Sequence, residues 1–305
     1  MARSIHLRFA KLPSGLACYP RVVLTRRQPI TEVSDPPEFH ARVERVVIAQ
    51  DHVAKYAAVC GFRTEEGVPV TFPHLLATPL HLKIFSTEAF PLRPMGLIHV
   101  SNVIEMPGVL RPGLAVDVEV AVRNYRKTDA GMAFDLDSQL TSEGRVLWRE
   151  TCVFLSRWPD SVERTGGRPP RPPKAPKDAR VLLELNVSMK TAWDYAMVSH
   201  DFNPIHLNAR VARFFGLRGA ISHGMWSLAR SLAEEPSVTP APDARLQTQF
   251  LTPVQLPAKV SVKEWVEGGE TRRAMCDVRT GRVHMYAHWT SAAGVKEDAE
   301  EKAPD

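Results

Sequence analysis

Two side chains well suited to move protons lie close together in the segment YAMVSHDFNPIHLN, residues 195–208. Asp201 offers a carboxylate and His206 an imidazole, and Asn203 followed by Pro204 stands between them. Asn caps free backbone N–H groups and Pro at the first helical position sacrifices no hydrogen bond, so this pair predicts that a helix begins at Pro204. His206 then falls in the first turn and can point back toward Asp201. We expect the two to act as one acid–base pair.

A second chemically capable feature follows in GAISHGMWSLARSLAEE. Its apolar residues Met225, Leu228, Ala229 and Leu232 recur with helical spacing. This spacing predicts an amphipathic helix that begins near residues 222–224. The first N–H groups of a helix have no partner within it, and the helix dipole adds positive potential there. Gly224 carries no side chain that would keep a substrate carbonyl away. We therefore expect its N–H to bind an oxyanion, with Ser222 and His223 beside it contacting the substrate or capping the helix.

These parts suit the addition of water to a polarised double bond, or its removal. An α,β-unsaturated thioester needs its carbonyl polarised so that charge can collect as an enolate. It also needs a water held over the β-carbon by two groups that can pass protons. Gly224 suits the first task, and Asp201 with His206 suits the second.

The segment resembles a known family. YAMVSHDFNPIH followed by ISHGM is similar to the signature of MaoC-type (R)-specific enoyl-CoA hydratases and 3-hydroxyacyl-thioester dehydratases, and these residues carry the resemblance: Tyr195, Ala196, Ser199, Asp201, Asn203, Pro204, Ile205, His206, His223 and Gly224. It implies that Asp201 and His206 form the catalytic dyad, that Asn203 orients it and that the Gly224 amide holds the thioester oxygen. The implied reaction is a lyase step of fatty-acid or related acyl metabolism that uses no cofactor and yields the (R)-3-hydroxyacyl thioester.

One residue departs from that signature. A glycine often stands between the serine and the aspartate in this family, whereas this chain has His200. Its side chain would either narrow the mouth of the pocket or face solvent. We assign it no catalytic role.

Other interpretations of the same residues remain open. A turn with a capped helix would account for the Asn-Pro pair without any chemistry. A metal site built from His200, Asp201, His206 and His223 is conceivable, but the chain lacks the HExxH type of helical spacing, so we expect no metal. An acyl-CoA thioesterase that uses Asp201 as base or nucleophile would keep the same fold, as would a noncatalytic acyl-thioester binding protein.

The chain as a whole looks duplicated. YAAVCGF (56–62) matches YAMVSHD (195–201), FPHLLATPL (72–80) matches ISHGMWSLA (221–229), and the second copy holds extra residues between the two matched points, including NPIHLNARVARFF. The first copy has Phe62 where the second has Asp201, so we expect catalysis in the second copy alone. The layout resembles the double hot-dog members of the MaoC family. This resemblance implies an α+β fold of two repeats, each an antiparallel sheet wrapped around a long central helix.

Both copies also end in predicted strands. LAVDVEVAVRNYR alternates apolar and polar residues from Val116 to Val122, MAFDLDSQLTS alternates likewise, and TDAG between them is typical of a hairpin. RVHMYAHWTS shows the same alternation after a TGR turn. We expect an antiparallel meander at the end of each copy.

A stretch of clustered prolines at residues 156–180 separates the copies, because proline cannot sustain helix or ladder hydrogen bonds. The expected organisation is a noncatalytic N-terminal repeat with an N-terminal extension at 1–155, the Pro-rich linker at 156–180, the catalytic repeat at 181–293 and an acidic flexible tail at 294–305. For a chain of 305 residues we expect two cores.

Composition bounds the partners and the compartment. Apolar residues make up 44% and charged residues 24%, as in soluble proteins, and no apolar run reaches the ~18 residues that would span a membrane. The net charge of +5 comes from scattered Lys and Arg, which fits an anionic small molecule at least as well as nucleic acid, and we expect neither nucleic acid nor a membrane as partner. The resemblance implies an acyl-CoA or acyl-carrier-protein thioester as the partner. Four separated cysteines favour the cytoplasm.

Two features leave alternatives. The first 31 residues lack Asp and Glu, which is compatible with a transit peptide to an organelle matrix, whereas LACYPRVVL within them is equally compatible with an ordered edge segment. Two fused repeats already supply the usual pairing of hot-dog units, and such a chain is also compatible with a homodimer.

Overall fold

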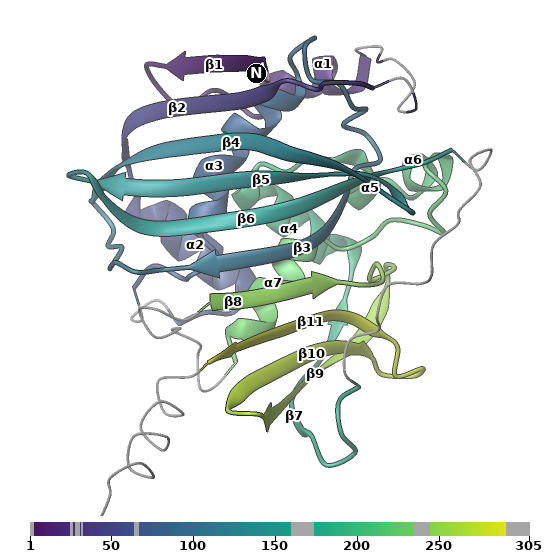
Figure 1. Ribbon diagram of the computed structural model, residues 1–305. Coiled ribbons are helices and arrows are strands. Elements are labelled where there is room, and N and C mark those ends of the chain that lie inside the picture. The colour runs from purple at the N-terminus through teal and green to yellow at the C-terminus, as the bar shows by residue number, and fades with distance from the viewer. Residues whose placement is uncertain are drawn as a thin grey trace, which may run out of the picture.

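The computed structural model describes residues 3–24, 27, 31, 33–63, 67–159, 174–234 and 245–290. In this part of the chain the strands form one sheet, and most of the helices lie on one of its faces (Figure 1). The strands are β1 (Ser4–Phe9), β2 (Glu38–Val47), β3 (Ile98–Glu105), β4 (Ala115–Thr128), β5 (Gly131–Ser142), β6 (Arg145–Arg157), β7 (Arg180–Val187), β8 (Arg245–Phe250), β9 (Ala258–Glu267), β10 (Glu270–Asp277) and β11 (Val283–Thr290). The helices are the 3-10 helix η1 (Leu16–Cys18) and the α-helices α1 (Tyr19–Leu24), α2 (Gln50–Cys60), α3 (Pro73–Phe85), α4 (Met189–Ser199), α5 (Pro204–Leu207), α6 (Ala209–Phe214) and α7 (Gly224–Leu232).

The sheet contains one strand order twice. The first repeat runs β2-β4-β5-β6-β3 and the second runs β7-β9-β10-β11-β8. The two runs join where β3 pairs antiparallel with β8, from Ser101 opposite Gln249 to Glu105 opposite Arg245. Strand β1 is an addition at the outer edge, where it pairs in parallel with β2. Both predicted meanders are confirmed, because β4-β5-β6 and β9-β10-β11 pair antiparallel in sequence.

The helices repeat in the same way. α2 and α4 are each 11 residues long, and each ends at a residue with a left-handed backbone, Gly61 and His200. The two helices pack against each other between the repeats. α3 and α7 are the central helices of the two repeats. The second repeat inserts α5 and α6 before its central helix, and these helices contain the extra residues that the sequence comparison identified.

The two repeats share a core, in contrast to the two cores expected from length. Fully buried residues of both repeats belong to one contiguous apolar cluster, for example Phe39 and Leu80 in the first and Leu228 and Val260 in the second. A small second cluster surrounds Trp265. The single main core follows from the β3–β8 pairing, which makes the sheet continuous beneath helices that lie on the same face.

The ends of the predicted linker are ordered. β6 continues to Arg157 and β7 begins at Arg180, while residues 160–173 of the linker and the predicted tail at 294–305 lie outside the described residues. The LACYPRVVL segment is helical, and it buries Cys18 and Val22. Among the described residues, no helix combines the length and the apolar character needed to cross a membrane.

Candidate active site

The turn that carries Asp201 is fixed by the end of α4. The Ser199 hydroxyl donates to the Tyr195 carbonyl at 2.7 Å and accepts the Asp201 N–H at 3.2 Å. Between them the chain reverses at His200, whose φ of 58° lies in the region that favours glycine. The first repeat has Gly61 at the equivalent position, with a φ of 85°. The glycine that is usual in the signature therefore suits the left-handed backbone of this turn. In this chain His200 adopts the same backbone conformation, and its side chain is exposed.

Asn203 begins α5 as predicted. Its side-chain oxygen accepts the Ile205 N–H at 3.3 Å, with Pro204 at the first helical position. The contact from Asn203 to Asp201 comes from its backbone, because the Asn203 N–H donates to Asp201 Oδ1 at 3.1 Å. The Asn203 side chain thus holds the helix that carries His206, while its main chain holds the carboxylate.

Helix α5 brings His206 to Asp201 and His223. One ring nitrogen of each histidine and one carboxylate oxygen of Asp201 lie within 4.8 Å of one another. The two imidazole rings are stacked, with centroids 3.8 Å apart and planes inclined by 27°. His223 Nε2 lies 3.1 Å from the Asp201 carbonyl oxygen and 3.9 Å from Asp201 Oδ2. The three side chains therefore form one compact cluster around the turn.

The cluster combines an ionised carboxylate with neutral imidazoles. Burial raises the pKa of Asp201, but His223 and His206, the Asn203 N–H and the Tyr19 hydroxyl together hold it below its ordinary value. Burial lowers the pKa of His206, and Asp201 offsets this only in part. Burial and the adjacent His206 lower the pKa of His223 to about 3. Near neutral pH the site therefore holds two groups that can accept a proton, the Asp201 carboxylate and the neutral His206 ring.

Hydrogen bonds to the backbone assign the tautomer of each neutral ring. His206 Nδ1 lies 2.9 Å from the Ile221 carbonyl oxygen, which can only accept, so the proton is on Nδ1 and Nε2 has a lone pair. His223 Nε2 bonds to the Asp201 carbonyl oxygen, so its proton is on Nε2. Each ring then keeps one lone pair, His206 on Nε2 and His223 on Nδ1, a buried atom with no hydrogen-bond partner among the described residues.

The start of α7 lies next to this cluster, because His223 directly precedes Gly224, the first residue of the helix. The Ser227 N–H donates to the His223 carbonyl at 3.2 Å, so the N–H groups of the preceding helical residues have no partner within α7. His223 is at the N-cap position but caps no N–H group with its side chain. Its ring contacts Asp201 instead.

The two residues on either side of His223 have different environments. Ser222 donates its N–H to the Val254 carbonyl at 2.9 Å, and its buried hydroxyl has no hydrogen-bond partner among the described residues. At Gly224 a Cβ would come 3.2 Å from the ring of Phe250 in β8. The missing side chain at Gly224 therefore allows Phe250 to pack closely against the helix start.

One residue of the site was not predicted from the sequence. The Tyr19 hydroxyl, from α1, donates to Asp201 Oδ1 at 3.0 Å. The two residues are 182 positions apart, and Tyr19 belongs to no motif. In the sequence, the notable feature of this N-terminal segment is its basic composition. That composition does not indicate a contact between Tyr19 and Asp201.

Two groups of side chains in the described part of the chain bring potential metal-ligand atoms close together. Asp201, His206 and His223 form one group, and His74, Glu150 and Cys152 form the other. His200, the fourth residue considered for a metal site, is not in the first group. The stacked rings of His206 and His223 lie nearly parallel, whereas the ligands of one metal ion must converge on it.

Comparison with known proteins identifies relatives of this chain. Residues 168–287 match the model of the MaoC like domain. The chain is 33% identical over 277 residues to 3-hydroxyacyl-thioester dehydratase X of Mycobacterium tuberculosis, an alignment that covers 90% of this chain and 97% of the relative.

Solved structures are similar over most of the chain. HtdX of Mycobacterium tuberculosis superposes with a TM-score of 0.71 at 28% identity, covering 83% of this chain and 99% of the other. A MaoC-like dehydratase from Phytophthora capsici has a TM-score of 0.64 at 16% identity, covering 87% and 99%, and shows the shared fold. The signature residues, the doubled hot-dog fold and the full-length relative lead to one conclusion: the chain belongs to the MaoC-like dehydratase family.

Proposed function

We propose that this protein catalyses the reversible hydration of trans-2-enoyl thioesters to (R)-3-hydroxyacyl thioesters, with Asp201 and His206 as the catalytic pair. One observation carries the proposal. An ionised carboxylate and a neutral imidazole with a free nitrogen lie within 4.8 Å of each other beside the start of α7. The named activity of the relative, a 3-hydroxyacyl-thioester dehydratase, supports the same reaction class.

In the hydration direction, Asp201 and His206 Nε2 hold one water molecule over the β-carbon of the enoyl group. The base that receives a proton from this water turns it into a nucleophile, and its oxygen forms a bond to the β-carbon. The electron pair of the double bond moves toward the thioester carbonyl. Free N–H groups at the start of α7, that of Gly224 first among them, stabilise the enolate oxygen, which typically contributes about 3 kcal/mol for each donor.

The proton that completes the reaction comes from the same water. Neither Asp201 nor His206 Nε2 carries a proton at the start, because the pKa of each lies below its ordinary value. The base that deprotonates the water therefore returns this proton to the α-carbon, so that H and OH add across the double bond and the enzyme regains its initial state. Dehydration follows the same steps in reverse.

Ser222 and His223 have positioning roles in this proposal. The His223 ring bonds to the Asp201 carbonyl and stacks on His206, so it holds the two catalytic residues in register. The unpartnered Ser222 hydroxyl is available to the thioester group. Either coenzyme A or an acyl carrier protein would supply the thioester, and the chain would serve fatty-acid or related acyl metabolism.

The test uses purified protein with trans-2-enoyl-CoA and enoyl-carrier-protein substrates of several chain lengths. We expect loss of the absorbance of the conjugated thioester, no release of free CoA, and a 3-hydroxyacyl product with the (R) configuration by chiral chromatography. Release of free CoA would instead identify a thioesterase. Binding without turnover at every chain length would identify a noncatalytic acyl-thioester binding protein.

A further inference from the structure

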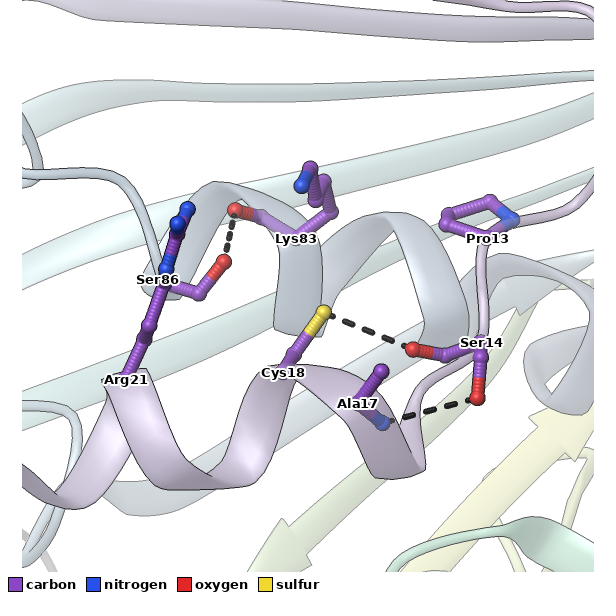
Figure 2. Close-up of a pocket in the computed structure, with 7 residues that line it drawn as sticks. All are labelled: Pro13, Ser14, Ala17, Cys18, Arg21, Lys83 and Ser86. Atoms are coloured by element: carbon purple, nitrogen blue, oxygen red, sulfur yellow. Dashed lines mark hydrogen bonds between the residues drawn. The ribbon is translucent and has the colours of Figure 1, made fainter.

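The segment that precedes the first repeat is part of the wall around the catalytic turn. This segment, residues 13–24, is called the N-terminal strap below. It packs along the central helix α3 and buries Cys18 and Val22. Figure 2 shows the crevice between the strap and α3, lined by Cys18 and Arg21 from the strap and by Lys83 and Ser86 from the end of α3. The strap is thus attached to the first repeat.

The same strap also reaches the second repeat. At Gly15 an added Cβ would come 3.1 Å from Leu82 Cδ1 in α3 and 3.9 Å from the carbonyl oxygen of His200. The chain at Gly15 therefore lies between the central helix of the first repeat and the turn that carries Asp201. A strap held at both sides can place a side chain on that turn with little freedom.

Tyr19 is the side chain that the strap places there. Its hydroxyl donates to Asp201 Oδ1 at 3.0 Å. Burial and the neighbouring Asp201 raise the pKa of the Tyr19 phenol, so it keeps its proton and remains a donor. Asp201 Oδ1 also accepts the Asn203 N–H at 3.1 Å. One carboxylate oxygen is thus held by two donors, while Oδ2 lies on the side of His223, 3.9 Å from its Nε2.

We propose that Tyr19 is a positioning residue that fixes the Asp201 carboxylate, so that Oδ2 faces the water and the substrate. The inference rests on the proposed catalytic function of Asp201. A carboxylate rotates easily about its Cβ–Cγ bond, and two donors on one oxygen from different parts of the chain remove that rotation before substrate binds. The hydrogen bond from Tyr19 also favours the ionised carboxylate. Tyr19 lies outside residues 168–287, so the matched domain does not contain this interaction.

The first test is the Tyr19→Phe variant, which removes the hydroxyl and keeps the ring. We expect kcat for enoyl-CoA hydration to fall roughly 10- to 100-fold, because a hydrogen bond to a charged group is lost, while KM changes less than about threefold. Tyr125→Phe is the matched control, since the buried Tyr125 hydroxyl in β4 has no partner among the described residues. We expect the control to keep the wild-type kcat. Urea unfolding of each variant gives the folded fraction by which its rate is normalised.

The second test asks whether Tyr19 acts through Asp201. In an Asp201→Asn background, Tyr19→Phe should slow the residual reaction by less than about twofold, because the carboxylate that it positions is gone. An equal loss in both backgrounds would overturn the positioning role. A Tyr19→Phe rate within twofold of wild type would also overturn it, provided that Asp201→Asn is strongly impaired. This second result would leave the proposed function intact. If Asp201→Asn is itself fully active, the proposed site fails.

Discussion

The starts of α3 and α7 occupy the same place in the two repeats, yet the histidines there have different partners. In the first repeat, His74 Nδ1 lies 2.7 Å from the carboxylate of Glu150, a fully buried side chain. In the second, His223 bonds to a backbone carbonyl and stacks on His206. Burial lowers the pKa of both rings. Glu150 nevertheless raises the pKa of His74 above its ordinary value, whereas that of His223 falls to about 3.

Two neighbouring positions also differ between the repeats, with an apolar side chain in the first repeat at each of them. The first repeat has Leu75, a buried apolar side chain, where the sequence match places Gly224 in the second, and it has Phe62 where the second has Asp201. The first repeat therefore fills its helix start with apolar packing and an ion pair. In the second repeat the first N–H groups of α7 have no partner within the helix, and neutral imidazoles lie beside them. The fold tolerates both arrangements. The proposed function assigns the second arrangement to catalysis, and we assign the first to stability.

The largest expected effect concerns His206, which has no counterpart in the first repeat. His206→Gln removes the Nε2 lone pair that the proposed mechanism assigns to holding the water, so we expect kcat for enoyl-CoA hydration to fall about 10²- to 10⁴-fold. His288→Gln is the control, because His288 lies in β11 and pairs with Glu270 away from Asp201. Equal activity of the two variants would remove His206 from the dyad and with it the main difference between the repeats.

The buried ion pair of the first repeat gives the next effect. Burial raises the pKa of Glu150, but His74 and the Asn102 amide, which donates at 2.6 Å, lower it to about 2, so the residue is ionised. At about pH 6, where the raised pKa of His74 keeps its ring protonated, Glu150→Gln leaves this buried charge without its partner, and we expect the free energy of unfolding in urea to fall by about 3 kcal/mol.

The control for this variant is Glu44→Gln, which removes an exposed partner of Arg42 and should change stability little. A Glu150→Gln protein as stable as wild type would show that the first repeat does not depend on this pair.

A smaller effect is expected at the helix start. Gly224→Ala places a methyl group 3.2 Å from the Phe250 ring, so either the ring or the first turn of α7 must shift by a few tenths of an ångström. We expect kcat to fall roughly tenfold through a misplaced N–H group. Gly219→Ala adds a methyl group with nothing closer than 3.8 Å and should be neutral, and if both variants are equally active the Gly224 amide has no special role.

The smallest effect is on the pH dependence of stability, and its sign differs between the repeats. The pKa of His223 is lowered in the folded state, so this residue contributes stability above pH 6.5 that is lost as pH falls toward 3. The pKa of His74 is raised, so its contribution is present below pH 6.5 and is lost as pH rises through the folded-state value.

Urea unfolding at several pH values tests this difference. His223→Gln should reduce the loss of unfolding free energy between pH 6.5 and 5.5, by about 1 kcal/mol, whereas the cost of His74→Gln should shrink as pH rises above 6.5. The same sign of pH dependence for both variants would contradict the comparison of the two histidines.

Local features of the chain could be predicted, because each depends on neighbouring residues. Alternation predicted the meanders, and the Asn-Pro pair predicted the start of α5. Contacts between distant residues left no such signal. The β3–β8 pairing, which gives both repeats one core, the Glu150 partner of His74 and the Tyr19 bond to Asp201 each join segments far apart in the sequence.

The most direct test of the account compares kcat for enoyl-CoA hydration in two variants. One is Asp201→Asn, and the other is Phe62→Leu, at the equivalent position of the first repeat. The account predicts that Asp201→Asn loses about 10²- to 10⁴-fold in kcat with its fold intact, while Phe62→Leu stays within about threefold of wild type. An Asp201→Asn protein within tenfold of wild type would contradict it.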